Sequence, residues 1–341
     1  MRNFLWVVAC AVIALFSLNA RLDARSASSE ALGHLKRGNS FFQHGQPDRA
    51  IAEYQAAIRF NPDFPEAHYN LADALQSRHQ FDAAVHEYRE AIRLKPDCAL
   101  AHNSLAITLD QLGQIDAAIA EFREAVRLEP ANALVRNNFG VALADRGELE
   151  AAITQYRDAI GLNPHYARAH YNLGKALNDQ GQLSASVAEL REAIRWEPDF
   201  VEAHNNLGAV LQGMHQTDAA IRELQAAIRL DPTSSSTHNN LGNALRDEGQ
   251  PDAAIAEYHE AIRLQPDLAV AHNNLGNALK DIHQIDAAIA EYRKAITLDP
   301  ESAAAHDNLG KILKSSGQTP EAALEFAEAH RLDPRYTSPR Q

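Results

Sequence analysis

The chain has 341 residues, of which 45% are hydrophobic, 23% are charged and only 6% are aromatic. This composition is typical of a soluble globular protein and argues against collagenous, disordered or polytopic membrane chains. With 32 basic and 45 acidic side chains the net charge is −13, which argues against nucleic acid as the main ligand, because a phosphate-backbone binder needs a basic surface. Cys10 and Cys98 form no Cys-x-x-Cys motif, so neither a disulfide framework nor cysteine-based zinc or redox chemistry is expected.

The first segment, residues 1–26, differs from the rest. Phe4–Leu18 is fifteen residues long and apolar except for Ser17. This length matches the core of a signal peptide and falls short of the roughly 20 residues that cross a bilayer. We therefore predict export, to the periplasm or the medium. An uncleaved N-terminal membrane anchor is the alternative, because the small residues that follow form poor cleavage sites.

A strict repeat occupies the remainder of the chain. Nine prolines recur 34 residues apart without an insertion or deletion. Placing each proline third from the end of its unit defines nine units, preceded by a linker (27–30) and followed by a tail (337–341). Repeat units of this kind stack on their neighbours. The nine units of this chain are 31–64, 65–98, 99–132, 133–166, 167–200, 201–234, 235–268, 269–302 and 303–336.

Each unit contains two apolar stripes with the spacing of amphipathic helices. In the unit 269–302 the first stripe contains Leu275 and Leu279, and the second contains Tyr292. Six of the nine units have Gly between the stripes, which suits a left-handed helix end. An Asp such as Asp286 follows three places later, and we expect it to cap the second helix. Each unit is thus predicted to be an antiparallel pair, helix A and helix B.

Small and large residues stand at fixed places in the units. Place 20 holds Ala, or Ser in one unit, place 27 holds Ala in all nine units, and place 24 between them holds Tyr, Phe or Leu. Place 8 holds Gly in seven units and Ala in two. This pattern resembles the tetratricopeptide repeat over all nine units. The resemblance implies an all-α fold, a right-handed superhelical solenoid of helix hairpins with the A helices on the concave side.

Asparagine recurs on helix A, away from its apolar stripe. Asn is a mediocre helix former, so helix propensity does not explain the recurrence. Its amide offers donors and an acceptor, which suits pairing with the main chain of an extended peptide. A solvated row, or hydrogen bonds between repeats, is the alternative. The sixth place holds Asn70, Asn138, Asn172, Asn206, Asn240, Asn274 and Asn308, and the fifth place holds Asn103, Asn137, Asn205, Asn239 and Asn273.

The phrase Ala-His-x-Asn-Leu-Gly, as at 271–276, is similar to the repeats of the O-GlcNAc transferase superhelix. In that family the matching asparagines hold the main chain of the substrate. The resemblance implies the same role for the seven sixth-place asparagines. Only five residues follow the last unit, so we expect this chain to lack the catalytic domain of that family.

Basic residues recur near the carboxyl end. Arg246, Lys280 and Lys314 occupy the twelfth place of three consecutive units. They predict a groove that favours an acidic segment, with an ordinary solvated face as the alternative.

Histidine stands at the fourth place of eight units. Copies about 10 Å apart cannot share one metal ion, whose ligand distances are near 2 Å, so a packing role is expected. No catalytic motif occurs. We therefore predict a non-catalytic scaffold without a cofactor, whose groove binds an extended protein segment. An assembly platform that uses its convex or end surfaces, or a regulatory or substrate-recruiting partner of a glycosyltransferase, is the alternative.

Overall fold

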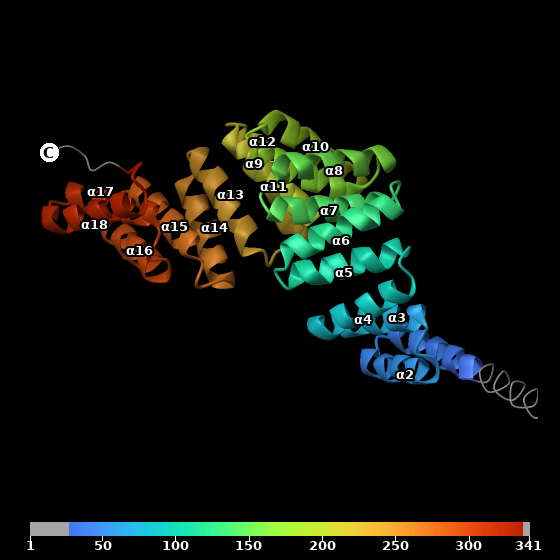
Figure 1. Cartoon of the computed structure of the whole chain (residues 1–341). Coiled ribbons are helices and arrows are strands. Elements are labelled where there is room, and N and C mark those ends of the chain that lie inside the picture. Colours follow the sequence, from blue (N-terminus) through green and yellow to red (C-terminus); the bar gives the residue numbers. More distant parts are fainter. Residues whose placement is uncertain (1–26, 337–341) are drawn as a thin grey trace, which may run out of the picture. The chain divides into compact units, whose positions relative to one another are not determined.

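The computed structural model describes residues 27–336, and within this range every regular element is a helix (Figure 1). The predicted leader (1–26) and tail (337–341) lie outside the described residues. Residues 27–30, predicted as a linker, belong to the first described helix (27–43), because no Gly or Pro separates them from it. None of the helices between residues 27 and 336 combines the length and the hydropathy needed to cross a bilayer.

The chain divides into two compact units, Met1–Pro164 and His165–Gln341. In the first unit, the helices after residues 27–43 are α2 (Pro47–Phe60), α3 (Pro65–Ser77), α4 (Phe81–Leu94), α5 (Ala99–Gln111), α6 (Ile115–Leu128), α7 (Ala133–Asp145) and α8 (Leu149–Leu162). The second unit contains α9 (Ala167–Asp179), α10 (Leu183–Trp196), α11 (Val201–Gly213), α12 (Thr217–Leu230), α13 (Ser235–Asp247), α14 (Pro251–Leu264), α15 (Ala269–Asp281), α16 (Ile285–Leu298), α17 (Ala303–Ser315) and α18 (Thr319–Leu332).

Helices pair as the repeat predicts. An odd-numbered helix A contacts the following helix B most extensively, and within each unit helix B then contacts helix A of the next pair. The predicted all-α fold of stacked helix hairpins is therefore confirmed for the described residues.

The A helices lie on the inner side of each of the two compact units. Helix α3 contacts α5, and α5 contacts α7, in the first unit; α9, α11, α13 and α15 form the same series in the second. Within each of the two compact units, no two of the described B helices contact each other to this extent. Because helices on the inside of a curved stack approach each other more closely, the A helices form the concave side of each unit. We call the surface at places 2, 5, 6, 9 and 12 of the A helices the inner face.

The turn from helix A to helix B has one conformation throughout the described chain. The fifteenth place has a positive φ in each of the nine repeats. It is Gly in six repeats and His79, His215 and His283 in the other three. The predicted left-handed helix end is thus confirmed. The predicted aspartate cap is wrong. Asp286 is the second residue of α16, and the N-cap is Gln284, which forms no capping hydrogen bond. The helix begins earlier because Ile285 packs against the core, and the aspartate instead lies near the positive end of the helix dipole.

Glycine at place 8 permits the close approach of the two helices of a pair. Tyr292 on α16 is fully buried, and a Cβ atom at Gly276 would lie 2.7 Å from its Cε1. Gly242 and Tyr258 repeat this contact at 2.6 Å. Since real Cβ atoms do not approach a ring so closely, the ring at place 24 in these two pairs occupies the space that a side chain at place 8 would need. Where Ala72 and Ala106 stand at place 8, the buried rings of Tyr88 and Phe122 must leave room for a methyl group.

Candidate functional site

The asparagines of the inner face form a hydrogen-bonded ladder between repeats. The amide of Asn274 donates to Oδ1 of Asn239 in the preceding repeat, with Nδ2 and Oδ1 3.0 Å apart. The same step, from place 6 to place 5, joins Asn138 to Asn103 at 3.2 Å, Asn206 to the Tyr171 hydroxyl at 3.1 Å, Asn240 to Asn205 at 3.0 Å and Asn308 to Asn273 at 3.0 Å. Both predicted rows, including the fifth-place Asn239 and Asn273, are therefore brought together in contacts between repeats.

One member of the sixth-place row departs from this pattern. Asn70 donates to Oδ1 of Asn39, a ninth-place residue, at 2.8 Å. Asn172 lies half-buried on α9. All seven sixth-place asparagines are only partly buried. An amide has two N–H groups and one carbonyl oxygen, and the ladder step uses one N–H. The ladder thus fixes each side chain while its remaining polar groups lie at the inner face.

Sequence reasoning missed a second set of amides, at place 9. The Tyr258 hydroxyl donates to Oδ1 of Asn243 at 2.7 Å, and the Tyr292 hydroxyl donates to Oδ1 of Asn277 at 2.8 Å. Burial raises the pKa of both tyrosines, so both hydroxyls stay protonated donors at neutral pH. The carbonyl side of each amide is therefore occupied, and its N–H groups point away from the tyrosine. Tyr at place 24 together with Asn at place 9 is the sequence signal for this contact.

The three predicted basic residues differ in their surroundings. Arg246 lies 3.7 Å from Asp281, measured from Nε to Oδ2. Lys280 and Lys314 are exposed, and neither forms an ion pair within the described residues. The structure therefore places all three on the A helices of the second unit, and two of them have uncompensated charges.

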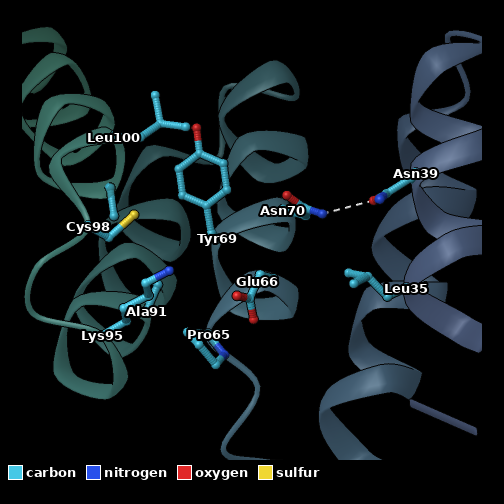
Figure 2. A pocket seen from close by; sticks show the side chains of 11 residues that line it. Leu35, Asn39, Pro65, Glu66, Tyr69, Asn70, Ala91, Lys95, Cys98 and Leu100 are labelled. Carbon is cyan, nitrogen blue, oxygen red and sulfur yellow. Dashed lines mark hydrogen bonds between the residues drawn. The ribbon is translucent and has the colours of Figure 1, made fainter. Parts of the chain in front are cut away.

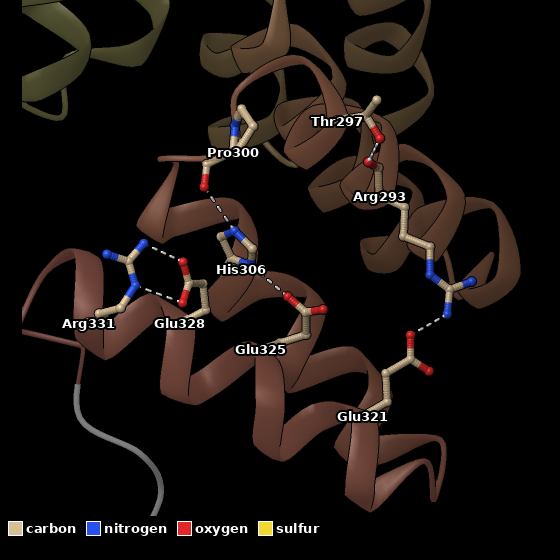
Figure 3. A network of polar contacts seen from close by, with 8 residues as sticks. All are labelled: Arg293, Thr297, Pro300, His306, Glu321, Glu325, Glu328 and Arg331. Carbon is tan, nitrogen blue, oxygen red and sulfur yellow. Dashed lines mark hydrogen bonds and ion pairs between the residues drawn. The ribbon is translucent and has the colours of Figure 1, made fainter.

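The fourth-place histidines connect three segments of the chain. In Figure 3, His306 lies between the Pro300 carbonyl of the preceding turn and Glu325 on α18. Its Nδ1 is 2.6 Å from Oε2 of Glu325, and its Nε2 is 3.2 Å from the carbonyl oxygen. The same contact to a glutamate nineteen residues later joins His34–Glu53, His68–Glu87, His102–Glu121, His170–Glu189, His204–Glu223, His238–Glu257 and His272–Glu291, at 2.6–2.7 Å. These histidines therefore stabilise the stack, and no group of three metal-ligating side chains occurs within residues 27–336.

One repeat replaces both partners of this contact. Arg136 stands at place 4 on α7, and Gln155 stands at place 23 on α8. Nε of Arg136 donates to the Pro130 carbonyl at 2.9 Å. Nη1 of Arg136 donates to Gln155 at 3.2 Å and to Asp158 at 2.7 Å. The paired change of histidine and glutamate to arginine and glutamine is the sequence signal that could have identified the glutamate partner.

A cavity of about 290 Å³ opens on the first unit beside the ladder. Figure 2 shows Leu35 and Asn39 on one side and Tyr69 and Leu100 on the other, with the Asn70–Asn39 hydrogen bond between them. Its walls are mostly apolar. The inner face of the first unit thus combines an apolar recess with the amide ladder, a feature that no sequence motif indicated.

Comparison with known proteins identifies the repeat. A family model described as TPR repeat matches residues 38–78, 140–181, 174–214, 242–282 and 283–317. Models described as tetratricopeptide repeat match residues 70–133, 201–234 and 223–256. No curated protein matches the chain.

Three similar solved structures support the same fold. The structure of the APC/C hetero-tetramer Cut9-Hcn1 has a TM-score of 0.62 at 19% identity, covering 82% of this chain and 55% of that one. A tetratricopeptide repeat protein from Parabacteroides merdae has a TM-score of 0.59 at 17% identity, covering 69% and 93%. PilF of Pseudomonas aeruginosa has a TM-score of 0.52 at 20% identity, covering 59% and 92%. This chain thus covers little more than half of the matched chain in the Cut9-Hcn1 structure. At these identities the likeness concerns the fold alone, that of a superhelical solenoid, and together with the family models it leads to one conclusion: the chain belongs to the tetratricopeptide repeat family.

Proposed function

We propose that this protein is a non-catalytic scaffold that binds an extended segment of another protein on its inner face. The observation that carries this proposal is the amide ladder. Each sixth-place side chain is only partly buried, and the step to the preceding repeat uses one of its N–H groups. The remaining N–H and the carbonyl oxygen suit the main chain of a peptide, which offers one donor and one acceptor per residue.

The spacing of the ladder fits an extended ligand. Neighbouring A helices have axes about 10 Å apart, and an extended chain advances about 3.3 Å per residue. One amide would therefore meet about every third residue of the ligand. Because the ladder holds each amide in place before binding, less side-chain freedom is lost on association. The proposed role is the one that the similarity to the repeats of O-GlcNAc transferase implies.

Photo-crosslinking of the full chain tests which surface binds. A photoreactive residue at Ala209, exposed on the inner side of α11, should capture peptide segments of a bound partner. The same residue at Lys294, exposed on α16, should capture few. Replacing Asn206, Asn240 and Asn274 with Ala should weaken capture at Ala209 while most helicity is retained. Capture mainly at Lys294, or capture at Ala209 that the triple variant leaves unchanged, would refute the proposal.

An assembly platform that uses an end surface is the second candidate. Leu324 on α18 is 71% exposed at the carboxyl end of the array. Contact with another protein at that end would bury this apolar side chain. Replacing Leu324 with Lys should then abolish association while the triple asparagine variant retains it.

A role as a partner of a glycosyltransferase is separable from both. It requires that a catalytic chain co-purifies with this protein, and that sugar-nucleotide turnover disappears when that chain is removed. Turnover by the isolated protein would contradict the proposal that it is non-catalytic.

The proposed location is outside the cytoplasm. The apolar run Phe4–Leu18 supports export or N-terminal anchoring. Fractionation of a tagged chain and sequencing of its mature amino end distinguish a cleaved leader from an anchor, and an intact chain in the cytoplasm would reject both.

A further inference from the structure

We infer that the inner face of α13, α15 and α17 binds an acidic, extended protein segment. This inference rests on the proposed peptide-binding function and names the class of partner for one part of the surface. Its starting point is that the surface presents hydrogen-bond donors and positive charge, although the chain as a whole has a net charge of −13.

The donors come from place 9. Because the tyrosine hydroxyls occupy Oδ1 of Asn243 and Asn277, only the N–H groups of these amides are directed to the inner face. Neither amide nitrogen has a hydrogen-bond partner within the described residues. Both side chains are partly exposed, so these N–H groups can meet an acceptor from a ligand.

The acidic side chains of this surface are already engaged. Asp247 accepts a hydrogen bond from Nε2 of Gln212 at 2.8 Å. Asp281 lies 3.7 Å from Arg246. Asp307, which is 6% exposed, lies 2.5 Å from Nζ of Lys311. Each carboxylate is thus compensated or hydrogen-bonded from within the protein.

Two cations are left without such a partner. Lys280 on α15 and Lys314 on α17 are exposed at equivalent places of consecutive repeats. With the axes of the A helices about 10 Å apart, the two ammonium groups suit carboxylates about three residues apart in an extended segment. A carboxylate accepts hydrogen bonds and donates none, so it suits both the lysines and the donor side of the place-9 amides.

Two labelled peptides test the inference with the full chain by fluorescence anisotropy. They are identical except that every third residue is glutamate in one and glutamine in the other. The glutamate peptide should bind about tenfold more tightly, the effect of two exposed ion pairs taken together, and added salt should reduce the difference. The double variant Lys280→Gln/Lys314→Gln should remove the preference, whereas Lys294→Gln on α16, which makes the same kind of charge change outside the inner face, should preserve it.

Equal binding of the two peptides, or an unchanged preference in the double variant, would overturn this inference and leave the peptide-binding function standing. Equal or tighter binding of a single-stranded oligonucleotide of similar charge would also overturn it, because the surface would then select any polyanion. Failure of the function itself has a different signature, which is the absence of crosslinks from Ala209 together with no binding of either peptide. Since both lysines are exposed, unchanged helicity and melting temperature of the double variant verify that it is folded.

Discussion

Nδ1 of His204 lies 2.7 Å from Oε2 of Glu223, and Nε2 of the same ring lies 3.1 Å from the carbonyl oxygen of Pro198. Both partners are hydrogen-bond acceptors when the glutamate is ionised. The ring satisfies both only when each nitrogen has a proton. The pair therefore holds one proton more than a neutral histidine beside a carboxylate, and the contact between consecutive repeats depends on that proton.

The first prediction is that stability falls as the pH rises. The hydrogen bond to Glu223 raises the pKa of His204, assisted by the Pro198 carbonyl and opposed by burial. The pKa values of His68 and His102 are raised in the same way, first by the hydrogen bond to their glutamates. A raised folded-state pKa gives stability that is complete below the unfolded value of about 6.5 and is lost as the pH rises through the folded value. The melting temperature should thus decrease from about pH 6 to about pH 8.

Replacing His68, His102 and His204 with Gln should flatten this decrease, because no group with a raised pKa is then left at these three places. His259, exposed on α14, provides the matched control. His259→Gln should leave the dependence of the melting temperature on pH unaltered. A melting temperature that is constant over this range, or an equal slope in the triple variant, would show that these pairs do not hold the extra proton.

The second prediction concerns the exceptional repeat. Arg136→His alone should destabilise the protein, because the histidine then faces Gln155 and the contact with Asp158 is lost. Adding Gln155→Glu should restore stability, since it recreates the histidine–glutamate pair of eight other repeats. We expect a coupling free energy of about 0.5–3 kcal/mol in a double-mutant cycle measured by denaturant unfolding. Strictly additive effects of the two substitutions would contradict the exchange of partners.

The hairpin fold was predictable because its determinants are local and repeated. Proline at place 32 and glycine at place 15 mark the helix ends, and apolar periodicity gives the faces. The aspartate cap was predicted wrongly, since burial of Ile285 extends the helix beyond the residue that propensity favours as its start.

The candidate site was only partly predictable. The asparagine rows were visible in the sequence, but whether an amide such as Asn274 turns to Asn239 or to solvent depends on the offset between stacked repeats. That offset results from packing. The glutamate partner of each histidine was hidden for a different reason, because its nineteen-residue spacing crosses a turn and matches no helical period.

The third prediction is that Gly276→Ala destabilises the protein by about 1–3 kcal/mol through overpacking. The added Cβ would lie 2.7 Å from Cε1 of Tyr292, a ring that is fully buried. Gly213, the last residue of α11, is the control, because a Cβ there meets nothing within 4 Å. Gly213→Ala should be neutral or stabilising by about 0.5–1 kcal/mol, owing to the lower backbone entropy of alanine in the unfolded chain. Equal free energies of unfolding for the two variants would mean that the ring does not need the glycine.

The fourth prediction separates a ladder from a row of independent solvated amides. Asn274→Ala removes the donor to Asn239 and should cost about 1 kcal/mol of unfolding free energy, the usual net contribution of one hydrogen bond. In a chain that already has Asn239→Ala, Asn274 has no Oδ1 acceptor there to lose. Asn274→Ala should then cost less unfolding free energy than it does in the unmodified protein. The cycle between these two positions should therefore show a coupling of about 0.5–1.5 kcal/mol.

The control cycle pairs Asn274 with Asn206, which stands at the same place two repeats earlier and donates to the Tyr171 hydroxyl. Two side chains of one row that share no partner should act additively, within about 0.3–0.5 kcal/mol. If both cycles are additive, each amide is bonded to water and the ladder does not link the repeats. If only the Asn274–Asn239 cycle shows coupling, the amides are held by the neighbouring repeat, and their second N–H groups reach the inner face in fixed positions.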